Sequence, residues 1–204
     1  MHQPLDAAVA DAERYHRGQL RKGTHVPYVS HLLAVCSLVL EAGGSDVEAT
    51  AALLHDAVED VQIPNMSGTE VLAEIGARHG DAVAHIVKAC SDDFAVPGQP
   101  KKPWRERKDR YIARLSDPDE SGSVLLVSAA DKLHNLRSIY AEWQQVGDAV
   151  WDRFSAPRPR RDSSLWYYRS LYNVYAARAQ RDERLLTLIQ PMGRLLRELE
   201  TAPH

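Results

Sequence analysis

Cysteine is scarce in this sequence, because only Cys36 and Cys90 occur among its 204 residues. Cys36 lies within an apolar run and Cys90 follows another, so we expect buried thiols rather than a disulfide framework or a cysteine metal site. The longest apolar run, from Leu32 to Leu40, has nine residues with one serine and is too short to cross a bilayer. The N-terminus lacks the basic start and apolar stretch of a signal peptide. A cytoplasmic protein without membrane association is therefore expected.

An excess of positive charge is also missing, since the formal net charge is -3 at pH 7. This balance does not predict binding to nucleic acid. Hydrophobic residues make up 44% and charged residues 26% of the chain, as in ordinary globular proteins. No shift in composition marks a boundary, and the length suits one domain with a sizeable core. We therefore expect a single domain over residues 1–204.

Alternating runs of β-branched residues are scarce, whereas Ala, Leu, Glu and Arg dominate, so the pattern predicts helices almost throughout. The helices are expected over about residues 6–19, 28–41, 47–59, 67–75, 80–90, 104–115, 124–143, 165–175 and 183–199. Loops are expected at 20–27, 92–103 and 155–162. The predicted fold class is all-α, a helical bundle of roughly eight to ten helices.

Four ionisable residues end the most apolar of these helices: His55, Asp56, Glu59 and Asp60. His55 and Glu59 are four residues apart, as are Asp56 and Asp60, so each pair is expected on one side of that helix. Burying such groups is costly unless they are paired or bind a metal. The alternative is a helix end that leaves the core and reaches solvent.

Asp131 follows a second apolar run and lies four residues before Asn135, so the two side chains are expected to project together. His31 begins a third apolar segment. The alternative to a metal ligand here is a core histidine whose ring nitrogens are hydrogen-bonded. Two imidazoles and two carboxylates form a mixed nitrogen and oxygen set. Such a set suits Mn, Fe, Co, Ni or Zn better than Mg or Ca.

Three segments occur in the order RKGTHVPYVSH (21–31), ALLHDAVED (52–60) and SAADKLHNLR (128–137). In this order they resemble the hydrolase domain of the RelA/SpoT alarmone family, and most closely its small stand-alone hydrolases of the HD superfamily. The similarity spans His16 to Tyr140, with residues 155–204 as a C-terminal extension of the same domain. The resemblance implies an HD-type helical bundle that hydrolyses the 3′-pyrophosphate of guanosine 3′,5′-bis(diphosphate), ppGpp, and releases pyrophosphate.

The resemblance also implies roles for individual residues. The metal ligands, usually for Mn²⁺, match His31, His55, Asp56 and Asp131. Glu59 and Asp60 match an acidic pair that activates water and transfers protons. Arg21 and Lys22 match a basic pair against the guanine base, while Asn135 and Ser138 match nucleotide contacts. The chain departs from the family at Gly23-Thr24-His25, where the common loop is a residue shorter and has Ser after the Lys. Thr24 is a candidate for the missing hydroxyl.

A polyphosphate substrate beside an acidic metal site requires cationic side chains. Arg105 and Lys108 are three residues apart and are expected to share a helical face that meets phosphates. The alternative is a solvated surface helix with charge pairs one turn apart. Three other functions are also compatible with the sequence: hydrolysis of ppApp, NADPH or a plain nucleotide; a non-catalytic nucleotide-binding module; and a helical bundle without a ligand.

Overall fold

The computed structural model describes residues 5–59, 62–92 and 100–202. This part of the chain folds into nine α-helices and one 3-10 helix without a β-strand, which confirms the all-α prediction. The helices are α1 (Leu5–Tyr15), α2 (Val29–Glu41), α3 (Asp46–Leu54), α4 (Gly68–His79), α5 (Asp81–Cys90), α6 (Trp104–Leu115), α7 (Gly122–Val146), η1 (Gly147–Arg153), α8 (Arg160–Arg178) and α9 (Arg184–Thr201).

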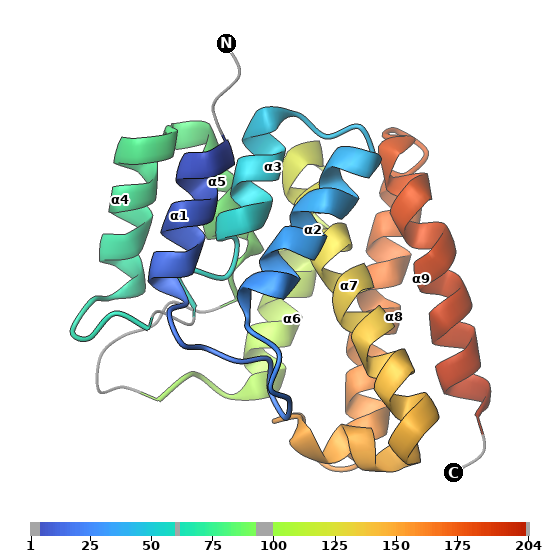
Figure 1. Cartoon of the computed structure of the whole chain (residues 1–204). Coiled ribbons are helices and arrows are strands. Elements are labelled where there is room, and N and C mark those ends of the chain that lie inside the picture. The colour runs from blue at the N-terminus through green and yellow to red at the C-terminus, as the bar shows by residue number, and fades with distance from the viewer. Residues whose placement is uncertain (1–4, 60–61, 93–99, 203–204) are drawn as a thin grey trace.

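The longest helix, α7, runs through the middle of the molecule and packs against α2, α3, α5, α9 and η1 (Figure 1). Its N-terminal half is an unbroken buried stretch from Val124 to Asp131. A helix that is apolar on all sides must be covered on all sides, which explains its central position. Helices α1, α4 and α5 lie on one flank of the molecule, and α8 and α9 lie on the other.

Helix α3 begins with a capping box, in which the Ser45 hydroxyl accepts from the Glu48 backbone N–H and the Glu48 carboxylate accepts from the Ser45 N–H. Its residues from Glu48 to Leu54 are all buried. The prediction that this helix continues to Glu59 is wrong, because α3 ends at Leu54. Tight turns follow, with hydrogen bonds from the Ala57 N–H to the Leu54 carbonyl and from the Glu59 N–H to the Asp56 carbonyl.

This early end has a consequence for the side chains that follow. Residues 55–59 do not have the four-residue repeat of an α-helix, so the expected pairing of His55 with Glu59 along one helical face is also wrong. Residue 60 lies outside the described part of the chain. The turn instead presents His55 and Asp56 side by side at the end of a buried helix.

The segment between α1 and α2 forms a small closed loop. Leu20 and Pro27 form an isolated antiparallel bridge, and the Arg21 N–H donates to the Val26 carbonyl over 2.8 Å. Gly23 adopts a φ of 77°, which is unfavourable for residues with a side chain. Helix α1 ends at Tyr15 rather than near Gln19, because the chain turns into this loop with the Gln19 N–H bonded to the His16 carbonyl.

The remaining predicted helices are present, but the loop expected over 155–162 ends earlier, because α8 begins at Arg160. The capping box of Ser67 and Glu70 begins α4, and the segment between α5 and α6 is not helical where it is described. Both cysteines are free and buried. Among the described helices, none combines the length and the apolar character needed to span a membrane.

Candidate metal centre

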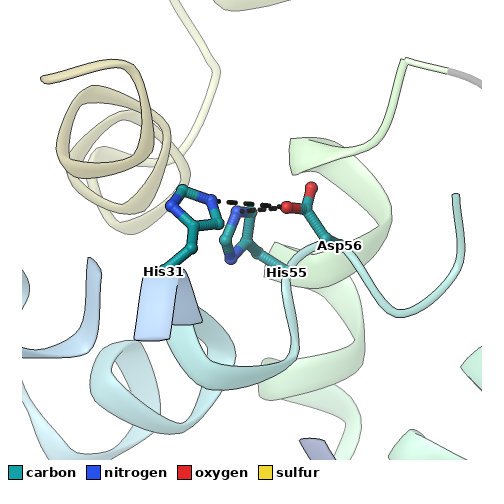
Figure 2. Close-up of side chains that lie close together, drawn as sticks. All are labelled: His31, His55 and Asp56. Carbon is teal, nitrogen blue, oxygen red and sulfur yellow. Dashed lines mark ion pairs between the residues drawn. The ribbon is translucent and has the colours of Figure 1, made fainter. Parts of the chain in front are cut away.

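Four side chains from three parts of the sequence meet beside α7. His31 comes from the first turn of α2, His55 and Asp56 follow α3, and Asp131 lies in the buried stretch of α7. The His31 Nε2 atom lies 3.5 Å from Asp56 Oδ2 and 3.2 Å from Asp131 Oδ1. The His55 Nε2 atom lies 3.1 Å and 3.6 Å from the same two oxygens. Figure 2 shows both imidazoles directed at the Asp56 carboxylate.

The hydrogen bonds of the two imidazoles leave their Nε2 atoms free to bind a cation. His55 Nδ1 lies 2.8 Å from the Ala52 carbonyl, which can only accept, so Nδ1 carries the proton. His31 Nδ1 lies 2.7 Å from His134 Nδ1. Both Nε2 atoms are buried and have no hydrogen-bond partner among the described residues. A lone pair that faces a carboxylate is unfavourable unless a proton or a metal ion lies between them.

The arrangement fits a metal ion on geometric grounds. His31, His55 and Asp56 offer ligand atoms within 4.8 Å of one another. Nitrogen and oxygen ligands about 2.0–2.2 Å from a metal lie roughly 3.0–3.6 Å from each other, for cis-octahedral or tetrahedral angles. The distances of 3.1–3.6 Å between the histidines and the two aspartates match this range. The residues therefore fit a divalent transition metal.

Electrostatics support the same conclusion. Burial alone favours neutral His55, but Asp56 and Asp131 outweigh it and raise the pKa of His55 well above its usual value. Burial also opposes ionisation of Asp131, yet Lys132 and the two histidines hold the pKa of that carboxyl well below its usual value. The centre thus contains two carboxylates and attracts positive charge, which a proton on His55 supplies when no metal is bound.

Neighbouring side chains orient both carboxylates. The Tyr28 hydroxyl donates to Asp56 Oδ2 over 2.6 Å, and Asn135 Nδ2 donates to Asp131 Oδ1 over 2.5 Å. Lys132 pairs with the other oxygen of Asp131. Such contacts fix the direction of a metal ligand and tune its basicity.

Two cavities adjoin this centre and share Tyr28 and Asn135 in their walls. The larger has a volume of about 890 Å³ and is bounded by the loop from Gln19 to Tyr28 and by the C-terminal half of α7. The smaller has a volume of about 130 Å³ and includes Asp56 and Asp131 in its lining. Asp56 and Asp131 thus line the smaller cavity, and Tyr28 and Asn135, which contact these two carboxylates, also line the larger one.

Five of the predicted nucleotide contacts line the larger cavity: Arg21, Lys22, Thr24, Asn135 and Ser138. The Arg21 guanidinium donates to Asn135 Oδ1 over 2.8 Å, which links the loop to the metal centre. The Thr24 hydroxyl donates to the Arg21 carbonyl over 2.9 Å and accepts from the Val26 N–H over 3.1 Å. This hydroxyl is therefore used to shape the loop.

The two predicted phosphate contacts on α6 lie in different places. Lys108 lines the smaller cavity, where it pairs with Asp92 and lies over the Tyr167 ring with Nζ 4.6 Å from its centroid. Arg105 lines neither cavity. Its guanidinium lies 3.6 Å from the centroid of the Trp166 ring and pairs with exposed Asp109. The structure does not bring Arg105 to the metal centre.

Glu59 also lines the smaller cavity, with Oε1 accepting from the Asp92 N–H over 2.7 Å. Burial, with Asp92 and Asp56 close by, raises the pKa of Glu59 to about 8. The carboxyl therefore holds a proton near neutral pH when no metal is bound. Asp60, the other predicted proton-transfer residue, lies outside the described residues.

Several residues of this region were not predicted from the sequence. His134 and Lys132 belong to the same motif as Asp131: Lys132 pairs with its neighbour Asp131 on α7, and the contact of His134 with His31 follows from the packing of α2 on α7. Tyr167 also lines the smaller cavity, and its buried hydroxyl has no hydrogen-bond partner among the described residues. The sequence of α8 around Tyr167 gives no signal that this side chain reaches the cavity.

Comparisons with known proteins agree with this geometry. A family model described as an HD domain matches residues 8–158. The mouse protein named guanosine-3′,5′-bis(diphosphate) 3′-pyrophosphohydrolase MESH1 is 35% identical over 140 residues, covering 67% of this chain and 69% of its own. A GTP pyrophosphokinase of Streptomyces coelicolor is 34% identical over 136 residues, which are 66% of this chain but only 14% of the relative.

A solved structure shows the same fold. The crystal structure of lmo0812 from Listeria monocytogenes EGD-e is 26% identical, with a TM-score of 0.64, and the match covers 84% of this chain and 99% of that one. The family match includes all four candidate ligands and the loop from Gln19 to Tyr28. The chain belongs to the HD-domain family of the RelA/SpoT type.

Proposed function

We propose that this protein is a metal-dependent phosphohydrolase that removes the 3′-pyrophosphate of ppGpp and releases pyrophosphate. The observation that carries the proposal is the pair of buried Nε2 atoms of His31 and His55, which have no hydrogen-bond partner among the described residues and face the carboxylates of Asp56 and Asp131 at the small polar cavity. The activity named for the MESH1 relatives, at 33–35% identity, supports the choice of substrate.

The residues that would hold the metal are His31, His55, Asp56 and Asp131, and we propose Mn²⁺ as the ion. When bound, such an ion lowers the pKa of a coordinated water and polarises a phosphoryl oxygen. Asn135 and Tyr28 keep the two carboxylates in place, and the Ala52 carbonyl keeps His55 in the tautomer that ligation requires.

Each of the two cavities would bind a different part of the substrate. The larger one has the size for a nucleoside and carries the cations Arg21 and Lys22 on its loop wall, where they pack against the base. The smaller one has the size for a phosphate group and carries Lys108 and Lys132. These two ammonium groups donate to phosphate oxygens and offset the repulsion from the acidic centre.

Proton transfer falls to the acidic residues beside the centre. A pKa near 8 suits Glu59 for exchanging a proton close to neutral pH. Glu59 or Asp60 takes a proton from the attacking water, and whichever of the two holds a proton returns it to the departing 3′-oxygen. Pyrophosphate then leaves, and the nucleotide keeps a free 3′-hydroxyl.

Another nucleotide, such as ppApp or NADPH, is the second candidate substrate. The observation that favours it is the use of the Thr24 hydroxyl inside its own loop, which weakens the assignment of that hydroxyl to the guanine base. We also propose that residues 155–204 belong to the same domain, because α8 and α9 both pack against α7.

The test is a nucleotide panel, with metal analysis of the same sample. Purified protein with Mn²⁺ is expected to release pyrophosphate from ppGpp with a large preference over adenine analogues. Asp56→Ala and Asp131→Ala are expected to abolish turnover, whereas Asp109→Ala, on the exposed face of α6, serves as the matched control. Turnover that survives both changes and chelation would refute the mechanism.

A further inference from the structure

We propose that Arg153 is a positioning residue for nucleotide binding, which holds the loop from Leu20 to Pro27 against the end of α7. The inference rests on the proposed function, because it assigns the larger cavity to the nucleoside. Arg153 is the last residue of η1 and lies about 130 positions along the chain from the loop. Figure 1 shows the loop between α1 and α2 reaching the η1 segment at one end of the molecule.

The contacts of the guanidinium connect three elements. Arg153 Nη1 donates to the Lys22 carbonyl over 3.3 Å and also pairs with the Glu142 carboxylate on α7. The Arg153 side chain is 16% exposed, so this ion pair is more shielded than an ordinary surface pair. The guanidinium also lies 5.1 Å from the centroid of the Phe154 ring. Arg153 thus contacts Glu142, the Phe154 ring and the backbone of the loop at Lys22.

Gly23 completes the contact. A Cβ atom at this position would lie 3.4 Å from Arg153 Cδ, and the φ of 77° already disfavours a side chain. The stem of Arg153 therefore lies in van der Waals contact with the loop at Gly23. Within the loop, backbone bonds join Arg21 to Val26 and Thr24 to Arg21, so it moves as one unit.

The position of this unit decides the shape of the larger cavity. Lys22 and Gly23 of the loop, Glu142 of α7 and Arg153, which contacts both Lys22 and Glu142, all line this cavity. Arg21 on the same loop reaches Asn135 at the metal centre. When Arg153 holds the loop, the groups that meet the base are in place before the nucleotide arrives. Without it, binding must also order the loop, which costs affinity.

The probe is GDP, because it fills the nucleoside cavity without a 3′-pyrophosphate. Calorimetry on the metal-loaded protein is expected to give a Kd for Arg153→Ala that is roughly tenfold higher than for the wild type. Arg153→Met keeps the stem against Gly23 and Phe154 but loses the guanidinium, and it is expected to show the same loss. The matched control is Arg137→Ala, on an exposed position of α7 outside both cavities.

Hydrogen exchange supplies a second readout that a general loss of stability would not reproduce. Amides of residues 21–28 are expected to exchange faster in Arg153→Met, while those of α7 and the affinity for Mn²⁺ stay as in the wild type. A GDP affinity within twofold of the wild type in both variants, or unchanged exchange in the loop, would overturn the proposal. If the wild type binds GDP but does not hydrolyse ppGpp, the proposed function fails and the role of Arg153 is still measured.

Discussion

The Nδ1 atom of His31 lies 2.7 Å from the Nδ1 atom of His134, so one imidazole donates to the other. Burial, together with nearby His31 and Arg21, lowers the pKa of His134 to about 4, which makes it neutral at pH 7. Neutral His134 can accept at Nδ1, and His31 then donates from Nδ1 and keeps a lone pair on Nε2. This is the tautomer that a metal ligand requires.

Loss of this partner is expected to weaken metal binding. His134→Ala leaves His31 free to rotate and to change tautomer, so the affinity for Mn²⁺ is expected to fall about 10–100-fold. His134→Asn offers a carbonyl acceptor and is expected to recover part of the loss. Competition with a chromophoric chelator measures the affinity, and His85→Ala, exposed on α5, is the control. Equal affinity in His134→Ala and the wild type would show that His31 needs no such partner.

Metal binding is expected to stabilise the fold. A ligand present at 100 times its Kd stabilises the native state by about 2.7 kcal/mol, which corresponds to roughly 5–10 °C in Tm for a protein of this size. Adding Mn²⁺ to the chelator-treated wild type is expected to give a shift of this order. Asp131→Asn loses one ligand charge and is expected to lose most of the shift. A shift of the same size with Ca²⁺ would contradict a site built from two imidazoles and two carboxylates.

The helices of this protein follow from its sequence better than their ends do. Ser67 and Glu70 predict the start of α4, because a capping box satisfies backbone groups through neighbouring residues. The end of α3 at Leu54 has no such local signal. Ala57 and Val58 continue the apolar pattern, and both are fully buried although they lie in the turn. Tertiary packing, which the sequence pattern does not contain, decides where this helix stops.

The candidate site likewise contains residues that the sequence predicts and contacts that depend on tertiary packing. Burial of charge on apolar segments indicated His55, Asp56 and Asp131, since such groups need partners. His31 followed mainly from the family resemblance, because a single histidine in an apolar run is more often a hydrogen-bonded core residue than a metal ligand. The contact of Arg153 with the loop carbonyl of Lys22 joins two distant segments and has no sequence signal at all.

Glu59 is expected to make the stability of the metal-free protein depend on pH. Its pKa of about 8 in the folded state lies above the ordinary value of 4.5, so the folded protein holds this proton more tightly than the unfolded chain. The resulting stabilisation is complete below the ordinary pKa and is lost as the pH rises towards 8. The free energy of unfolding is expected to fall by at most about 1.4 kcal/mol per pH unit over this window from this group alone.

Glu59→Gln removes the titration and keeps an oxygen that accepts from the Asp92 N–H. Between pH 5 and about pH 8, the wild type is therefore expected to lose stability relative to this variant. Urea unfolding in the presence of a chelator measures the difference, and Glu41→Gln, at the exposed end of α2, is the control. A constant difference across the range would mean that Glu59 titrates at an ordinary pKa.

Lys108 and Arg105 provide a test of which α6 cation meets phosphate. Lys108 lines the smaller cavity, and its side chain is 17% exposed. Arg105 is bound to Trp166 and Asp109 and is 58% exposed. Hydrogen bonds to charged groups contribute about 1.5–3 kcal/mol, so Lys108→Ala is expected to lower kcat/KM roughly 10–100-fold. Arg105→Ala removes an exposed pair and a contact with a ring, and kcat/KM is expected to stay within twofold of the wild type.

The two variants are made on one helix, three residues apart, so they share any general effect of weakening α6 on α8. Pyrophosphate release from ppGpp, measured alongside Tm, separates that effect from substrate binding. A similar loss in both variants at unchanged Tm would mean that the helical face carrying both cations meets the phosphates, as the spacing alone predicts. A loss confined to Lys108→Ala would follow from the structure, in which Asp92 and the Tyr167 ring hold this one ammonium group at the smaller cavity.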